Sequence, residues 1–132
     1  MPINNVTSAD ERLSISEVAE LAGLSTHTLR YYERAGLMLM PIERGSSRHR
    51  QYTSDDVRWV GFLTKLRSTS MPIARVREYV DLARRGDGTV AERLELLLIH
   101  RMSVAAQLEE MNKSLAAIDF KIATYQGRTP TE

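Results

Sequence analysis

A heptad pattern of apolar residues in the last third of the chain constrains the fold most. Apolar side chains recur there at alternating steps of four and three residues, and Arg101 is the polar member of the series. The apolar members are Val90, Leu94, Leu97, Val104, Leu108, Met111, Leu115, Ile118, Ile122 and Tyr125. This spacing places the side chains along one seam of a helix, and such a seam needs a partner helix.

The partner is expected to be the same helix of a second subunit, because the chain contains no other heptad segment. We predict a dimerisation helix over residues 89–126, about 57 Å long at a rise of 1.5 Å per residue. The alternative is a helix that folds back on its own domain, but so small a domain cannot cover so long a stripe. Residues 86–88 are a loop between two glycines, and residues 1–12 and 127–132 are expected to be a disordered arm and tail.

A helix–turn–helix pattern stands near the beginning of the chain. Apolar spacing predicts a first helix over residues 15–22 and a second over residues 26–34. Gly23 permits the turn between them, and Ser25 can cap the second helix. Leu29 and Tyr32 lie three residues apart and form the buried face of that second helix.

The other face of the second helix carries cations and hydroxyl-bearing rings. Its members are His27, Arg30, Tyr31 and Arg34. Such groups bind phosphate oxygens and base edges, and the exposed face of a second helix enters the major groove. We therefore predict that His27, Arg30 and Tyr31 read bases, that Arg34 binds phosphate, and that Ser25 lies at the same interface.

A basic hairpin, or wing, is predicted between the second and third helices. Turn formers at Pro41 and residues 45–47 separate residues 37–40 from residues 48–52. Alternation places Arg48, Arg50 and Tyr52 on one face, where we expect them to bind phosphates. His49 lies on the other face and is also counted as a DNA contact. An ordinary solvent-facing hairpin is the alternative.

Charge supports this interpretation locally rather than globally. The net charge is only +1, but residues 27–50 contain five Arg against two Glu. A solvated basic face would give the same count. The chain has no cysteine, which excludes disulfides, thiolate metal sites and thiol redox chemistry. It shows no signal peptide or apolar run of membrane length, so we expect a soluble cytoplasmic protein without membrane association.

Two further helices complete the first domain. Thr53 and Asp56 have the spacing of a capping box at the start of a third helix. Its buried side is expected to carry Val57, Val60, Leu63, Thr64 and Leu66. A fourth helix is predicted from about Pro72 to Arg85. The expected fold is therefore mainly α, with a winged helix–turn–helix domain over residues 13–85 followed by the long helix.

These motifs together resemble a known family. Residues 15–37, which include Leu29-Arg30-Tyr31-Tyr32-Glu33, and the wing sequence Arg50-Gln51-Tyr52 resemble the DNA-binding domain of the MerR family of bacterial transcription regulators. The long helix resembles the antiparallel coiled coil of that family, and the similarity covers about residues 13–126. It implies a homodimer on an inverted repeat in an overlong promoter spacer, which bends and untwists double-stranded DNA so that RNA polymerase engages both promoter elements.

Within that family the chain looks like the short aldehyde- and thiol-stress regulators. It shares Asp55-Asp56-Val57-Arg58-Trp59 and Arg67-Ser68 with them, but Lys65 stands where they place a reactive cysteine. Sensing through cysteine cannot be carried over, and the effector domain of multidrug-sensing relatives is expected to be absent. A small-molecule effector of unknown identity would need a space between the dimerisation helix and the DNA-binding domain.

The residues expected to line that space are Trp59, Phe62, Lys65, Leu66, Tyr79 and Met102. An amine at Lys65 could trap a carbonyl compound as a Schiff base if the side chain were buried. The alternative is an ordinary surface lysine.

Three classes of function could use a chain with these features. The leading hypothesis is a homodimeric, sequence-specific transcription regulator. The second is an architectural or phage-type DNA-bending protein without an effector. The third is an enzyme, but the sequence has no Ser-His-Asp set, glycine-rich phosphate loop or metal-ligand spacing, so we predict no catalysis, cofactor or metal.

Overall fold

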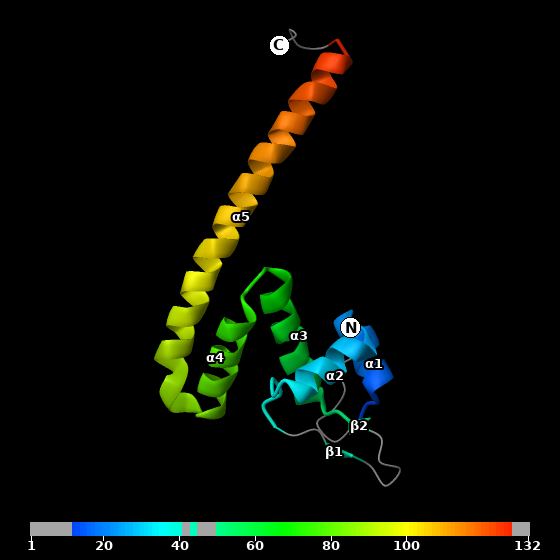
Figure 1. Ribbon diagram of the computed structural model, residues 1–132, viewed down its shortest axis with the longest axis vertical. Coiled ribbons are helices and arrows are strands. Elements are labelled where there is room, and N and C mark those ends of the chain that lie inside the picture. The colour runs from blue at the N-terminus through cyan, green and yellow to red at the C-terminus, as the bar shows by residue number, and fades with distance from the viewer. Residues whose placement is uncertain (1–11, 41–42, 45–49, 128–132) are drawn as a thin grey trace. The chain divides into compact units, whose positions relative to one another are not determined.

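The computed structural model describes residues 12–40, 43–44 and 50–127. Most of these residues are helical, and one short antiparallel hairpin interrupts the helices (Figure 1). In chain order the elements are α1 (Ile15–Ala22), α2 (Thr26–Arg34), β1 (Glu43–Arg44), β2 (Arg50–Gln51), α3 (Ser54–Ser68), α4 (Ile73–Arg84), the 3-10 helix η2 (Asp87–Thr89) and α5 (Val90–Tyr125). The mainly α architecture predicted from the sequence is confirmed. The chain forms two compact units, and the boundary between Arg93 and Leu94 falls inside α5.

Reciprocal side-chain caps determine where α1 and α3 begin. The Ser14 hydroxyl accepts a hydrogen bond from the Glu17 amide at 3.2 Å, while the Glu17 carboxylate accepts one from the Ser14 amide at 2.7 Å. Thr53 and Asp56 form the same pair at the start of α3, with distances of 3.1 and 2.9 Å. Each pair satisfies backbone donors that have no partner within the helix. The capping box predicted for Thr53 and Asp56 is confirmed.

Glycines in the left-handed conformation follow the first two helices. Gly23 has φ of 72° and Gly36 has φ of 73°. After α2, the amide of Leu37 donates to the carbonyl of Tyr32 at 2.9 Å and closes the helix. The chain therefore turns sharply at both points, which gives the helix–turn–helix its shape.

The hairpin differs from the sequence prediction in its first strand. That strand was expected at residues 37–40, but β1 is Glu43–Arg44, and its residues pair with Gln51 and Arg50 of β2. Leu37 and Met38 instead belong to the core, with exposed fractions of 0% and 4%. Burying two large apolar side chains is more favourable than a solvent-facing strand would be. The predicted turn formers, Pro41 and residues 45–47, lie outside the described residues.

The core of the first unit is built from one face of each of its four helices. Val18 of α1, Leu29 of α2, Leu63 of α3 and Val76 of α4 have no exposed surface. Helix α1 packs against both α2 and α3, and α3 packs against α4. Because the same residues carry the helical apolar spacing, the sequence pattern and the core agree.

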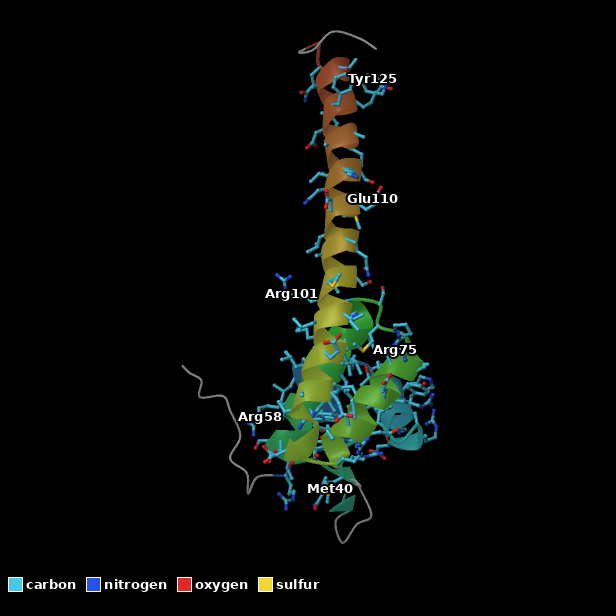
Figure 2. The ribbon with its side chains drawn as sticks, turned by 90° about the vertical axis from the view of Figure 1, so that its left-hand side faces the viewer. Met40, Arg58, Arg75, Arg101, Glu110 and Tyr125 are labelled. Atoms are coloured by element: carbon cyan, nitrogen blue, oxygen red, sulfur yellow. The ribbon has the colours of Figure 1, made fainter. Side chains whose placement is uncertain are left out.

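Helix α5 carries its apolar stripe on an uncovered surface. It extends over 36 residues without a break, and Figure 2 shows side chains such as those of Arg101, Glu110 and Tyr125 projecting along it. Leu108 and Leu115 of the stripe are 61% and 54% exposed. Large apolar patches on a surface mark interaction sites. Within the part of the chain that the structure describes, no helix is both long and apolar enough to cross a lipid bilayer.

Candidate nucleic-acid interface

Helix α2 has one buried face and one charged face. Leu29 and Tyr32 are almost completely buried, as predicted. Four other large side chains are exposed at positions i, i+3, i+4 and i+7, which lie on the same side of a helix. They are His27, Arg30, Tyr31 and Arg34.

The first turn of α2 suits an anion. The Ser25 hydroxyl caps the helix by accepting a hydrogen bond from the Thr28 amide at 3.1 Å. No acidic residue stands in this turn, so the turn itself carries no negative charge at the positive end of the helix dipole. Arg30 Nη1 lies 3.5 Å from the Thr26 hydroxyl, a distance that holds the guanidinium only weakly. The start of α2 therefore combines a helix terminus with an adaptable cation.

The structure describes little of the predicted wing contacts. Arg48 and His49 lie outside the described residues. For Arg50 the structure describes the backbone, which lies in β2 opposite Arg44. Their proposed contacts with DNA stay predictions.

Tyr52 does not occupy the surface position that alternation predicted. Its ring is completely buried, and its hydroxyl donates to the Glu33 carboxylate on α2 at 2.5 Å. Its backbone exchanges two hydrogen bonds with Leu13, each 2.8 Å long. A ring without exposed surface cannot bind a phosphate, so the phosphate contact predicted for Tyr52 is corrected. Tyr52 instead joins the hairpin to α2, because pairing with Leu13 turns its ring toward the core.

An aromatic cluster on α3 and α4 contains some of the residues expected near an inducer. Tyr79 stacks on Trp59 with ring centroids 5.9 Å apart and meets Phe62 at 5.6 Å. Leu66 is buried in the core, and Lys65 is exposed. The burial that a Schiff-base amine would require is therefore missing, and Lys65 is a surface lysine in this structure. Met102, the remaining candidate, belongs to the second compact unit.

Among the described side chains, no group of three or more His, Asp or Glu is placed to hold a metal ion. Asp55 pairs with Arg58, and Asp56 caps α3, which accounts for the two adjacent acids.

Comparison with known proteins decides the family. Residues 13–83 match the family described as "MerR HTH family regulatory protein", which is more than half of the chain. The chain belongs to the MerR family. This MerR-family chain is 32% identical over 111 residues to an uncharacterised HTH-type transcriptional regulator of Haemophilus influenzae, a match that covers 84% of this chain and 82% of the relative. It is 38% identical over 89 residues to the transcriptional regulator AdhR of Bacillus subtilis, which covers 67% and 63% of the two chains.

A solved structure of HiNmlR, described as a MerR family regulator lacking the sensor domain and bound to promoter DNA, has the same fold. Its TM-score is 0.81 at 30% identity, and the match covers 88% of this chain and 87% of that one. The MerR-family chain described here is accordingly a DNA-binding transcription regulator.

Sequence reasoning missed the side chains that hold α2 of this MerR-family domain in place. Glu33 accepts the Tyr52 hydrogen bond, and Arg84 reaches the segment after α2 from α4. Glu33 stands within the family motif, which is a signal that could have drawn attention to it. Arg84 is 48 residues from its partner Gly36, and no local sequence pattern predicts a contact over that separation.

Proposed function

We propose that this MerR-family protein is a homodimer that binds an inverted repeat in promoter DNA and distorts the duplex to control transcription. The observation that carries the proposal is a pair of surfaces: the exposed cationic face of α2 and the uncovered apolar stripe of α5. The first provides groups for phosphates and base edges, and the second provides a seam for an identical helix. RNA polymerase is then a partner through the DNA, in the cytoplasm.

The apolar stripe supports a dimer formed by α5 in antiparallel register, with Leu108 near the middle. Replacing Leu108 and Leu115 by Asp would place unpaired charges in the seam. Sedimentation should then show monomers, and DNA binding should fall sharply. Ala106→Asp with Ala117→Asp is the matched control, since it adds the same charge to α5 outside the stripe and should leave the dimer intact. A Leu108/Leu115 variant that stays dimeric would contradict the proposal.

The exposed face of α2 supports base reading by His27, Arg30 and Tyr31. Arg30→Ala should weaken operator binding by about 1–3 kcal/mol and relax the preference at one base position, as expected for a lost bidentate contact. Arg34→Ala and Arg50→Ala should instead weaken binding to all sequences and lower the salt slope by about one unit each. Fluorescence anisotropy with labelled duplexes measures both quantities. An Arg50 variant with unchanged affinity and salt slope would show that the wing does not bind phosphate.

The decisive test is to select binding sequences from a pool of random duplexes. A homodimer with two identical reading helices should select an inverted repeat. The selected site is then placed between promoter elements at several spacer lengths and transcribed with bacterial RNA polymerase. Initiation that depends on both protein and spacer length supports the proposal. Bent DNA with unchanged initiation at every spacer length would identify an architectural protein instead.

Any effector of this regulator must act without protein thiols, because the chain contains no cysteine. The chemistry of such a small molecule is left open by the proposal. Adding candidate compounds to the same transcription assay would show whether one changes initiation.

A further inference from the structure

The segment that leaves α2 is held by side chains from two other helices. The carbonyls of Gly36, Leu37 and Met38 are consecutive, and each accepts a side-chain hydrogen bond. Trp59 Nε1 of α3 donates to the Leu37 carbonyl at 2.7 Å. Arg84 Nη2 of α4 donates to the Gly36 carbonyl at 2.7 Å and also to that of Met38.

These contacts satisfy the carbonyls of residues 36–38, which lie outside any helix or strand. The chain has left α2 and has not yet reached β1, so this segment belongs to neither element, while Leu37 and Met38 are buried. A buried carbonyl without a donor destabilises the fold by about as much as a lost hydrogen bond. Trp59 and Arg84 supply the donors and thereby fix the path of the backbone between α2 and the hairpin.

The guanidinium of Arg84 suits this task better than an amine would. One terminal nitrogen serves carbonyls two residues apart, which requires donors in fixed directions. The other terminal nitrogen lies 3.8 Å from the Asp81 carboxylate on the same helix, which is a weak, solvent-exposed ion pair. The guanidinium is therefore held mainly by its two hydrogen bonds to backbone carbonyls.

We propose that Arg84, assisted by Trp59, is a positioning residue for DNA recognition. It sets the direction in which the chain leaves α2 and so the placement of the base-reading face relative to the hairpin. The inference rests on the proposed function of α2. It requires no contact between Arg84 and DNA, because Arg84 acts through the backbone of residues 36–38.

The test compares Arg84→Ala with Arg85→Ala. The two residues are adjacent and exposed, so each substitution removes the same charge from nearly the same place. Anisotropy titrations use the operator selected from random duplexes and a scrambled duplex of the same length. Arg84→Ala should weaken operator binding about tenfold more than Arg85→Ala, which corresponds to about 1.4 kcal/mol. Scrambled-DNA affinity and salt slope should be the same in the two variants, because these depend on charge.

Two further variants separate positioning from charge and from stability. Arg84→Lys restores the charge without the planar fork, so its operator affinity should stay below that of the wild type. Trp59→Phe keeps a ring beside Tyr79 but removes the donor to Leu37, and it should also lower operator affinity selectively. Circular dichroism and sedimentation establish that each variant is folded and dimeric, and Trp59→Phe decides the question if Arg84→Ala does not fold.

The outcomes distinguish two failures. A wild-type protein that selects no sequence refutes the proposed function, and the role of Arg84 with it. If the wild type does select a sequence, three results would refute the role of Arg84 alone. Arg84→Ala and Arg85→Ala could bind the operator equally well, or Arg84→Lys could bind it as tightly as the wild type does. Trp59→Phe could also lower the affinity for the operator and for scrambled DNA by the same factor.

Discussion

Thr89 joins the end of α4 to the beginning of α5, and its replacement by Val tests how strongly that junction holds. The hydroxyl donates toward the carbonyls of Leu82 and Gly86, at 2.6 and 2.8 Å. It also accepts a hydrogen bond from Arg93 Nε at 3.0 Å. Thr89 is 4% exposed, so water cannot replace these partners easily. Val has nearly the same shape, so the substitution removes the hydrogen bonds with little change in packing.

The structure allows the loss to be estimated. One buried hydrogen bond contributes about 0.5–1.5 kcal/mol, a bond from a charged donor contributes about 1.5–3 kcal/mol, and unpaired buried acceptors add a penalty. Arg93 also donates to the Gly86 carbonyl at 3.0 Å, which leaves that acceptor partly satisfied in the variant. We therefore expect Thr89→Val to lower the free energy of unfolding by about 2 kcal/mol.

The assay is urea unfolding followed by tryptophan fluorescence at fixed protein concentration. Trp59 is the single tryptophan of the chain and lies in the first compact unit, so its signal reports that unit. Thr89→Ser keeps the hydroxyl and is the matched control, with an expected loss below about 1 kcal/mol for one buried methyl group. The reasoning is refuted if Thr89→Val has the same free energy of unfolding as the wild type. It is also refuted if Thr89→Ser loses as much stability as Thr89→Val.

Four other substitutions should change the free energy of unfolding in a predictable direction, and each is measured by the same urea unfolding. Gly36→Ala should lower the free energy of unfolding by about 1–2 kcal/mol because φ is 73°, whereas Gly61→Ala should raise it by about 0.5–1 kcal/mol because Gly61 lies inside α3 with open space at its Cβ. Equal effects of the two substitutions would contradict this reasoning. Ser70 has φ of 74°, so Ser70→Gly should stabilise the protein by about 1 kcal/mol, and a less stable variant would show that no strain is present. Tyr52→Phe removes the hydrogen bond to half-buried Glu33 and should destabilise the protein by about 1 kcal/mol, with an unchanged unfolding midpoint as the refuting result.

The helices could be predicted because their signals are local in sequence. The heptad pattern predicted a helix over residues 89–126, and α5 is Val90–Tyr125. Thr53 and Asp56 are three residues apart and form a cap whose geometry depends only on that spacing. The exposed positions of His27, Arg30 and Arg34 likewise follow from the burial of Leu29 and Tyr32 on the same helix.

The hairpin could not be predicted to the same degree, because its register depends on distant residues. Leu13 pairs with Tyr52 across 39 positions of sequence, and this bridge decides which face of the second strand meets the core. Alternation indicated a strand but could not say whether Tyr52 faced solvent or the core. The same limit applies to residues 37–40, whose apolar sequence is as compatible with a buried segment as with a strand.

The last turn of α4 and the residues after it make hydrogen bonds to two other parts of the first compact unit: the exit of α2 and the first turn of α5. Arg84 binds the backbone that leaves α2, the Leu82 carbonyl accepts the hydrogen bond from Thr89, and the Gly86 carbonyl accepts that from Arg93 in the first turn of α5. All three contacts lie within the first compact unit, so the beginning of the proposed dimerisation helix belongs to the same compact unit as the proposed base-reading helix. A rotation of that first turn would have to break the Thr89 and Arg93 bonds or move α4, and α4 would carry the Arg84 contact with it. The junction therefore gives a physical reason why the start of α5 and the exit of α2 should respond together to substitution.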